Sequence, residues 1–182
     1  MIVVKLGGSL FDHPRLGPGL RAYLESLAPA AVVLTPGGGD AAEAVRKLDQ
    51  LHALGEENSH WLALRAMTVT AEFITRLIDL SAFGTRVRVA DSLAFAWNDL
   101  GRNGELPHSW DAASDSIAAR MAIVHGAERL ILLKSIAIPP GTSWTEAAER
   151  GWVDHYFPTA IAALSCPVEA VDFRSYLDSR NG

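Results

Sequence analysis

Short apolar runs alternate with longer segments of helical periodicity along the whole chain. The runs lie at residues 2–6, 31–35, 86–90, 130–133 and 167–171. They read as strands, and the strands are apolar on both faces, which is typical of a sheet that is covered on both sides. Strands of this kind, separated by helices, favour a mostly parallel arrangement. We therefore expect an α/β fold, a three-layer sandwich with an open sheet and helices on both faces.

The segments between these runs are expected to be helical. The first extends from Leu16 to Leu27, the second opens at Asp40, which can cap it, and a longer one covers about residues 59–80. Residues 93–97 fit either a short strand or a helical turn, and residues 98–107 fit a loop. Further helices are expected from Asp111 or Ser114 to about residue 125, at 143–150, at 159–164 and at the end of the chain.

Composition narrows the class of protein. A chain of 182 residues with 49% hydrophobic content suits one domain covering residues 1–182. A net charge of −5 without clustered Lys or Arg argues against a nucleic-acid partner. No apolar run approaches the roughly 18 residues of a membrane span, and we see no signal peptide. The single cysteine, Cys166, cannot form an internal disulfide, so we expect a reducing, cytoplasmic location.

The first strand ends in a lysine and two glycines. Lys5 lies at its end, and Gly7, Gly8 and Ser9 follow. Glycine lets backbone N–H groups approach a ligand without interference from Cβ, and Lys5 adds a positive charge. The pattern is typical of an anion site at the carboxyl edge of a sheet.

A second glycine turn follows the second strand. Gly37, Gly38 and Gly39 precede Asp40 and the expected helix. One interpretation is a tight strand-to-helix turn, and the other is a site where the helix start and its free N–H groups bind an anion. The two interpretations have similar weight. The pattern is neither a P-loop nor a dinucleotide fingerprint.

A third polar segment spans residues 107–120. Asp111 and Asp115 are four residues apart, so they share one face if both are helical. They then orient lysines, a ligand amine or a metal ion, or they simply cap the helix and stabilise its dipole. His108 and Trp110, in the preceding loop, suit the rim of a ligand site.

These segments, in this order, resemble the amino-acid kinase superfamily, which includes acetylglutamate, aspartate and uridylate kinases. The matching motifs are residues 5–9, 37–39, 114–119 and 126–133. The resemblance implies that Lys5 contacts the transferred phosphoryl group and that Asp115 organises the catalytic cations. It also implies that five glycines surround the phosphoryl group and the acceptor: Gly7, Gly8, Gly37, Gly38 and Gly39. Asp111 aligns with an acceptor-binding position of the family.

One departure from the family concerns the second lysine. Larger members carry it in a later Gly-Met-x-x-Lys segment, which this sequence lacks. Lys134, at the end of the strand at 130–133, is the candidate replacement, and Ser135 follows it in the nucleotide-phosphate region. The alternative for Lys134 is an ordinary solvated lysine. Residues 136–152 form a shortened nucleotide-binding lobe.

The compact chain looks most like the small branch of the superfamily that includes the methanofuran-pathway kinase. This implies ATP as donor, Mg²⁺ on the ATP phosphates without direct protein ligands, and an anionic acceptor such as (5-(aminomethyl)furan-3-yl)methyl phosphate. His60, Arg65 and His108 are possible acceptor contacts. The alternative function is a nucleotide- or oxyanion-binding protein without kinase turnover. A homo-oligomer paired through the long helix at 59–80 is also expected by resemblance.

Overall fold

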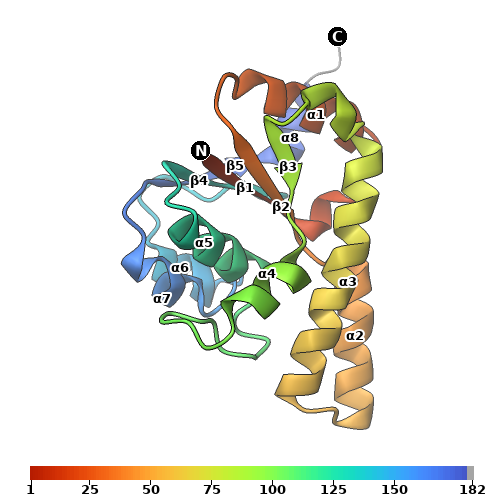
Figure 1. Ribbon diagram of the computed structural model, residues 1–182, viewed down its shortest axis with the longest axis vertical. Coiled ribbons are helices and arrows are strands. Elements are labelled where there is room, and N and C mark those ends of the chain that lie inside the picture. Colours follow the sequence, from red (N-terminus) through yellow and green to blue (C-terminus); the bar gives the residue numbers. More distant parts are fainter. Residues whose placement is uncertain (180–182) are drawn as a thin grey trace.

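The computed structural model describes residues 1–179. Within them, five parallel strands form one sheet in the order β3-β2-β1-β4-β5 (Figure 1). The central strand β1 pairs with β2 on one side and β4 on the other, so that Lys5 lies beside Thr35 and Leu132. The expected parallel sheet is confirmed. The strands are β1 (Ile2–Leu6), β2 (Val32–Pro36), β3 (Val87–Val89), β4 (Arg129–Lys134) and β5 (Val168–Asp172).

Helices connect successive strands, as the periodicity predicts. The segment around residues 93–97 is helical, because Asp91 caps it by accepting hydrogen bonds from the backbone N–H groups of Leu93 and Ala94. The helices are α1 (Leu16–Ser26), α2 (Gly39–His52), α3 (Glu56–Leu77), α4 (Ser92–Asp99), α5 (Ser114–Val124), α6 (Trp144–Glu149), α7 (Phe157–Ala160) and α8 (Phe173–Ser179), with short 3-10 turns η1 (Gly8–Leu10), η2 (Leu80–Phe83) and η3 (Ile161–Ala163).

Alternate residues of each strand feed two separate apolar layers. On one face, Val4 and Leu6 pack with side chains of α1, of the C-terminal part of α3 and of α8. On the other face, Val3 and Leu132 pack with α5, α6 and α7. Each fully buried aliphatic side chain contributes about 1.5–3 kcal/mol. The Lys5 side chain belongs to the second face, which directs it toward α5.

Helices α2 and α3 form a long hairpin that extends beyond the sheet (Figure 1). One prediction for this region is wrong: Asp40 does not cap α2. The helix begins at Gly39 with Gly38 at its N-cap and no side-chain cap, and Asp40 lies inside the first turn. Its negative charge there still stabilises the helix, because it lies near the positive end of the helix dipole. Among residues 1–179, every helix is too short or too polar to cross a membrane.

Candidate functional site

The two glycine turns contact each other at the carboxyl edge of the sheet. The Gly37 N–H donates to the carbonyl of Leu6 at 2.8 Å, which draws the turn after β2 toward the end of β1. A Cβ on Gly8 would overlap the backbone of Gly39. Gly39 has a φ of +50°, and a Cβ there would lie 2.8 Å from the Phe11 ring. Close packing of the turns therefore requires glycine at both positions, and the result is a continuous backbone surface between β1 and α2.

Lys5, Asp115 and Lys134 form a buried group beside these turns. The Lys5 Nζ lies 2.8 Å from Asp115 Oδ1, and the Lys134 Nζ lies 2.8 Å from Asp115 Oδ2. All three residues are less than 10% exposed. The strand ends of β1 and β4 supply the lysines, and the first turn of α5 supplies the carboxylate between them. Lys134 is thus a paired, buried lysine and not a solvated one.

The charges in this group hold Asp115 ionised. Burial alone would raise the pKa of its carboxyl, but the positive charges of Lys5 and Lys134 outweigh burial and bring the pKa down to about 2. Burial and the charge of Lys5 lower the pKa of Lys134 to about 8, against the opposing effect of Asp115. At neutral pH the group therefore contains two ammonium groups and one carboxylate.

Asp154 is a second carboxylate at this site, and sequence reasoning missed it. It accepts hydrogen bonds from the backbone N–H groups of Asp115 and Ser116 and from the Ser116 hydroxyl. Burial and the nearby charge of Asp115 raise the pKa of Asp154 to about 6. It lies 39 residues beyond Asp115, in a segment without a recognisable motif, so only the fold reveals the contact.

A cavity of about 280 Å³ opens beside the two lysines. Ser9 and Ser135 both line it, and their hydroxyl oxygens are hydrogen-bonded at 2.8 Å. Ammonium groups, hydroxyls and the backbone of a glycine turn are the donors that a chain of phosphates requires. We call it the donor cavity; it is lined by Lys5, Gly7, Gly8, Ser9, Lys134, Ser135, Ile136, Gly151 and Trp152.

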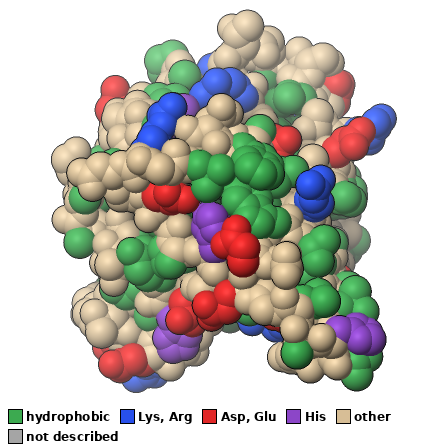
Figure 2. All heavy atoms as spheres, turned by 60° about the horizontal axis from the view of Figure 1, so that its bottom comes forward, with side chains coloured by type: hydrophobic (Ala, Val, Ile, Leu, Met, Phe, Trp, Pro, Cys, Tyr) green, Lys and Arg blue, Asp and Glu red, His purple; other side chains and the backbone are tan. Residues whose placement is uncertain are grey.

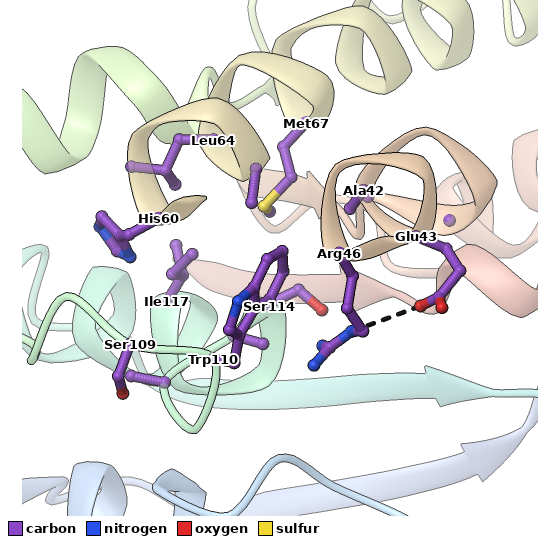
Figure 3. Close-up of a pocket in the computed structure, with 15 residues that line it drawn as sticks. Ala42, Glu43, Arg46, His60, Leu64, Met67, Ser109, Trp110, Ser114 and Ile117 are labelled. Carbon is purple, nitrogen blue, oxygen red and sulfur yellow. Dashed lines mark ion pairs between the residues drawn. The ribbon is translucent and has the colours of Figure 1, made fainter. Parts of the chain in front are cut away.

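A second cavity of about 200 Å³ lies on the other side of the glycine turns, between the α2–α3 hairpin and the loop before α5 (Figure 3). Trp110 forms one wall, and its indole N–H donates to Asp49 at 2.8 Å. The Arg46 guanidinium lies over the Trp110 ring, 4.1 Å from its centroid, and pairs with Glu43. Gly38 and Gly39 of the second glycine turn also line the cavity. We call this the acceptor cavity.

The sequence candidates around this cavity divide into two groups. His60 lines it, and the ring of His108 stacks on His60 with centroids 4.5 Å apart. His108 also pairs with Glu57 and Glu105. Figure 2 shows a face of the molecule on which acidic and histidine side chains lie close together. Arg65 is exposed on α3 and is not among the residues that line the cavity.

Asp111 and Asp115 do not share a helix face, because the structure has the second of the two predicted helix starts, Ser114, and not Asp111. Helix α5 begins at Ser114, so Asp111 precedes it in the loop and is exposed. The physical reason is that Asp154, from a distant part of the chain, satisfies the first N–H groups of α5. The Asp111 carbonyl instead accepts the backbone N–H of Tyr156 at 2.9 Å.

The side chains of the site fit Mg²⁺ only when phosphate oxygens supply part of its coordination. Within the described part of the chain, no group of three or more His, Cys, Asp or Glu side chains is arranged to hold a metal ion. Asp115 is already paired with Lys5 and Lys134, the two lysines that line the donor cavity. A phosphate-bound cation requires no such protein cage, because Mg²⁺ keeps several waters and binds substrate phosphates.

The parallel sheet with its two glycine turns and the buried Lys5–Asp115–Lys134 group lies in a fold that is similar to the fold of uridylate kinases. The structure is similar to uridylate kinase from Archaeoglobus fulgidus, with a TM-score of 0.60 and 16% identity over 93% of this chain and 89% of that one. It is also similar to UMP kinase from Ureaplasma parvum, with a TM-score of 0.55 and 10% identity over 92% of this chain and 87% of that one. These likenesses confirm the expected fold.

At the level of sequence, the chain is similar to [5-(aminomethyl)furan-3-yl]methyl phosphate kinase of Methanocaldococcus jannaschii. The two are 30% identical over 126 residues, which is 65% of this chain and 58% of that kinase. The match therefore spans little more than half the length of the relative. No family model matches the chain.

Proposed function

We propose that this chain is an ATP-dependent kinase that transfers the γ-phosphoryl group to an anionic small molecule. The observation that carries the proposal is the position of Lys5 and Lys134, paired with one carboxylate between the donor cavity and the glycine turns. Phosphoryl transfer requires in-line positioning and positive charge on the equatorial oxygens more than covalent chemistry. Two buried lysines beside a backbone cradle provide both.

We infer that the two substrates bind on opposite sides of the glycine turns, one in each cavity. ATP phosphates fit the donor cavity, where Ser9, Ser135 and the two lysines are donors. When it is bound with ATP, Mg²⁺ neutralises part of the negative charge of the phosphates. In this proposal Gly38 and Gly39 separate the acceptor from the donor, and both lysines hold the transferred group.

The acceptor class follows from the second cavity and from the relative. We infer a phosphate monoester such as (5-(aminomethyl)furan-3-yl)methyl phosphate, the substrate in the name of the similar M. jannaschii kinase. The cavity combines a cation, Arg46, with the flat apolar wall of Trp110. Burial, with a smaller effect of the His108 charge, lowers the pKa of His60 to about 4, so His60 is a neutral hydrogen-bonding group at neutral pH. Arg65, His108 and Asp111 have weaker support as acceptor contacts, because none of them lines this cavity.

The experiment that tests this function is incubation of the purified protein with ATP, Mg²⁺ and a panel of phosphate and carboxylate acceptors. We expect ADP formation that depends on a phosphate monoester. The second candidate function is a nucleotide- or oxyanion-binding protein without turnover, which is favoured by the pairing of both lysines with Asp115. ATP binding without transfer to any acceptor would support that candidate and contradict the kinase.

We also infer a homo-oligomer in which α3 contacts a second copy. Three large apolar side chains on this helix, Leu62, Val69 and Phe73, are 40%, 63% and 42% exposed. Their spacing places them along one stripe of the helix. Val69→Glu is expected to convert the oligomer to a monomer in sedimentation experiments, whereas an unchanged mass would contradict pairing through this stripe.

The remaining parts of the proposal concern the whole chain. We infer one kinase domain with a shortened nucleotide-binding lobe, because the donor cavity is lined by Ile136, Gly151 and Trp152 from the short segment 136–152. We infer a cytoplasmic location from the single cysteine, Cys166.

A further inference from the structure

The charges of the Lys5–Asp115–Lys134 group do not balance. Two buried ammonium groups share one carboxylate, which leaves one positive charge in excess. An uncompensated buried charge is costly, so either a lysine loses its proton or a second carboxylate lies nearby. The structure contains such a carboxylate in Asp154.

Asp154 makes four hydrogen bonds, two with Asp115 of this group and two with the next residue, Ser116. Its Oδ2 accepts the backbone N–H groups of Asp115 and Ser116 at 2.9 and 3.1 Å, and its Oδ1 accepts the Ser116 hydroxyl at 2.5 Å. In return, the Asp154 backbone N–H donates to Asp115 Oδ2 at 3.2 Å. One residue therefore closes the start of α5 and also holds the carboxylate that pairs with both lysines.

Asp154 also belongs to the segment that borders the donor cavity. Gly151 and Trp152, three and two residues before it, line that cavity. Two residues after it, the Tyr156 N–H binds the loop before α5 through the Asp111 carbonyl. Asp154 thus connects the wall of the donor cavity to the lysines that face it.

We propose that Asp154 is a positioning residue for phosphoryl transfer, the second counter-ion of the lysine pair, which keeps Lys134 protonated and Asp115 fixed between the two lysines. Its part in catalysis rests on the proposed kinase function. Its electrostatic effect on Lys134 does not depend on that function and is measured separately.

The protonation behaviour of the site agrees with this role. The groups that face Asp154 are Lys5 from β1, Lys134 from β4, and Asp115 and Ser116 from α5. Burial and the Lys5 charge lower the pKa of Lys134, whereas Asp115 and Asp154 raise it. Without the Asp154 charge, only Asp115 opposes burial, and Lys134 releases its proton at a lower pH.

The test is an NMR titration of lysines labelled with ¹³C at the carbon next to Nζ. The chain has three lysines, and Lys47 is exposed and serves as an internal reference. In the wild type, Lys134 is expected to titrate near pH 8, with a smaller step near pH 6 as Asp154 takes up a proton. Asp154→Asn is expected to abolish the smaller step and to move the Lys134 titration down by about one pH unit. Asp154→Glu, which restores the charge, is expected to return it toward the wild-type value.

Asp91 offers a matched control. It caps α4 with the same kinds of bond, accepting two backbone N–H groups and the hydroxyl of Thr68. Asp91→Asn is therefore expected to weaken a helix cap to a similar degree and to leave the titration of Lys134 in place. If the Lys134 titration shifted as far in Asp91→Asn as in Asp154→Asn, the shift would follow from lost stability alone. That result would overturn the proposal.

Kinetics then separate this proposal from the kinase function. In an active enzyme, the alkaline fall of kcat in Asp154→Asn is expected to move down in pH together with the Lys134 titration, with little change in KM for ATP. If the Lys134 titration shifts in Asp154→Asn but the wild type transfers phosphate to no acceptor, the kinase function is refuted. The role of Asp154 as the counter-ion is then still supported. An unmoved Lys134 titration, or the absence of the step near pH 6 in the wild type, would refute Asp154 as the counter-ion whatever the activity.

Discussion

Lys134 donates hydrogen bonds to both carboxylate oxygens of Asp115, at 3.1 and 2.8 Å, in a site that also contains Lys5. This position gives Lys134 access to the donor cavity, which it lines together with Lys5. The missing motif therefore does not leave Lys5 as the single cation of the site.

Replacement of Lys134 tests whether the second charge is needed. Lys134→Met keeps much of the side-chain volume and leaves Asp115 paired with Lys5, so we expect a folded protein. We expect kcat to fall by about a hundredfold or more, because a charge-stabilising donor is lost. The control is Lys47→Met at an exposed lysine, which is expected to retain full activity. Equal activity of the two variants in a steady-state assay would show that Lys134 has no part in transfer.

Contact between the two glycine turns predicts a strong effect of a single methyl group. In Gly8→Ala the new Cβ overlaps the Gly39 backbone, which has no flexible side chain to yield. We expect a loss of stability of about 1–3 kcal/mol in urea unfolding, together with loss of activity.

A matched control is Gly101→Ala, at a φ of +71° with open space around the new Cβ. Only backbone strain of about 1 kcal/mol is expected there, and activity should remain. A Gly8→Ala protein as stable and active as the wild type would contradict the packing of the turns.

Two tryptophans test the division between the cavities. Trp110 lines the acceptor cavity and Trp152 lines the donor cavity. Trp110→Ala is expected to raise KM for the acceptor by about tenfold with little change in KM for ATP, because a large apolar wall is lost. Trp152→Ala is expected to do the reverse. If both variants raised the same KM, the assignment of the two cavities would be wrong.

Buried His60 predicts a dependence of stability on pH. Burial lowers its pKa from 6.5 to about 4, so between these values the unfolded chain binds a proton that the folded protein does not. Stability from this group is complete above about pH 6.5 and falls as the pH decreases toward 4, by up to about 3 kcal/mol.

Asp154 acts in the opposite direction, since its pKa is raised and its folded form retains a proton up to about pH 6. The effect of His60 is therefore measured as a difference in unfolding free energy between proteins that all retain Asp154, so that the contribution of Asp154 cancels. Urea unfolding of His60→Gln is expected to lack the acid-side loss, and His52→Gln, at an exposed histidine, is expected to retain it. Identical pH profiles for wild type and His60→Gln would contradict the neutral, buried imidazole.

Local sequence predicts those parts of the site that one short segment determines. Lys5 and the glycine turns each follow an apolar strand, and parallel strands bring their carboxyl ends to one edge. The sequence left the start of α5 open between Asp111 and Ser114, because that start is set by Asp154, 39 residues beyond Asp115, and not by the nearest aspartate. Arg46 was missed among the residues of the acceptor cavity for a similar reason. It reaches the cavity by stacking on Trp110, and this contact exists only because α2 folds against the loop before α5.

The central claim is that Lys5 and Lys134 together direct the γ-phosphoryl group of ATP to a phosphate acceptor. The most direct measurement follows the label of [γ-³²P]ATP in the presence of Mg²⁺ and (5-(aminomethyl)furan-3-yl)methyl phosphate. We expect the label to appear in the diphosphate of this acceptor with the wild type and Lys47→Met, and to remain on ATP with Lys5→Met and Lys134→Met. Label that stays on ATP or appears only as inorganic phosphate with the wild type, across the whole acceptor panel, would contradict the account.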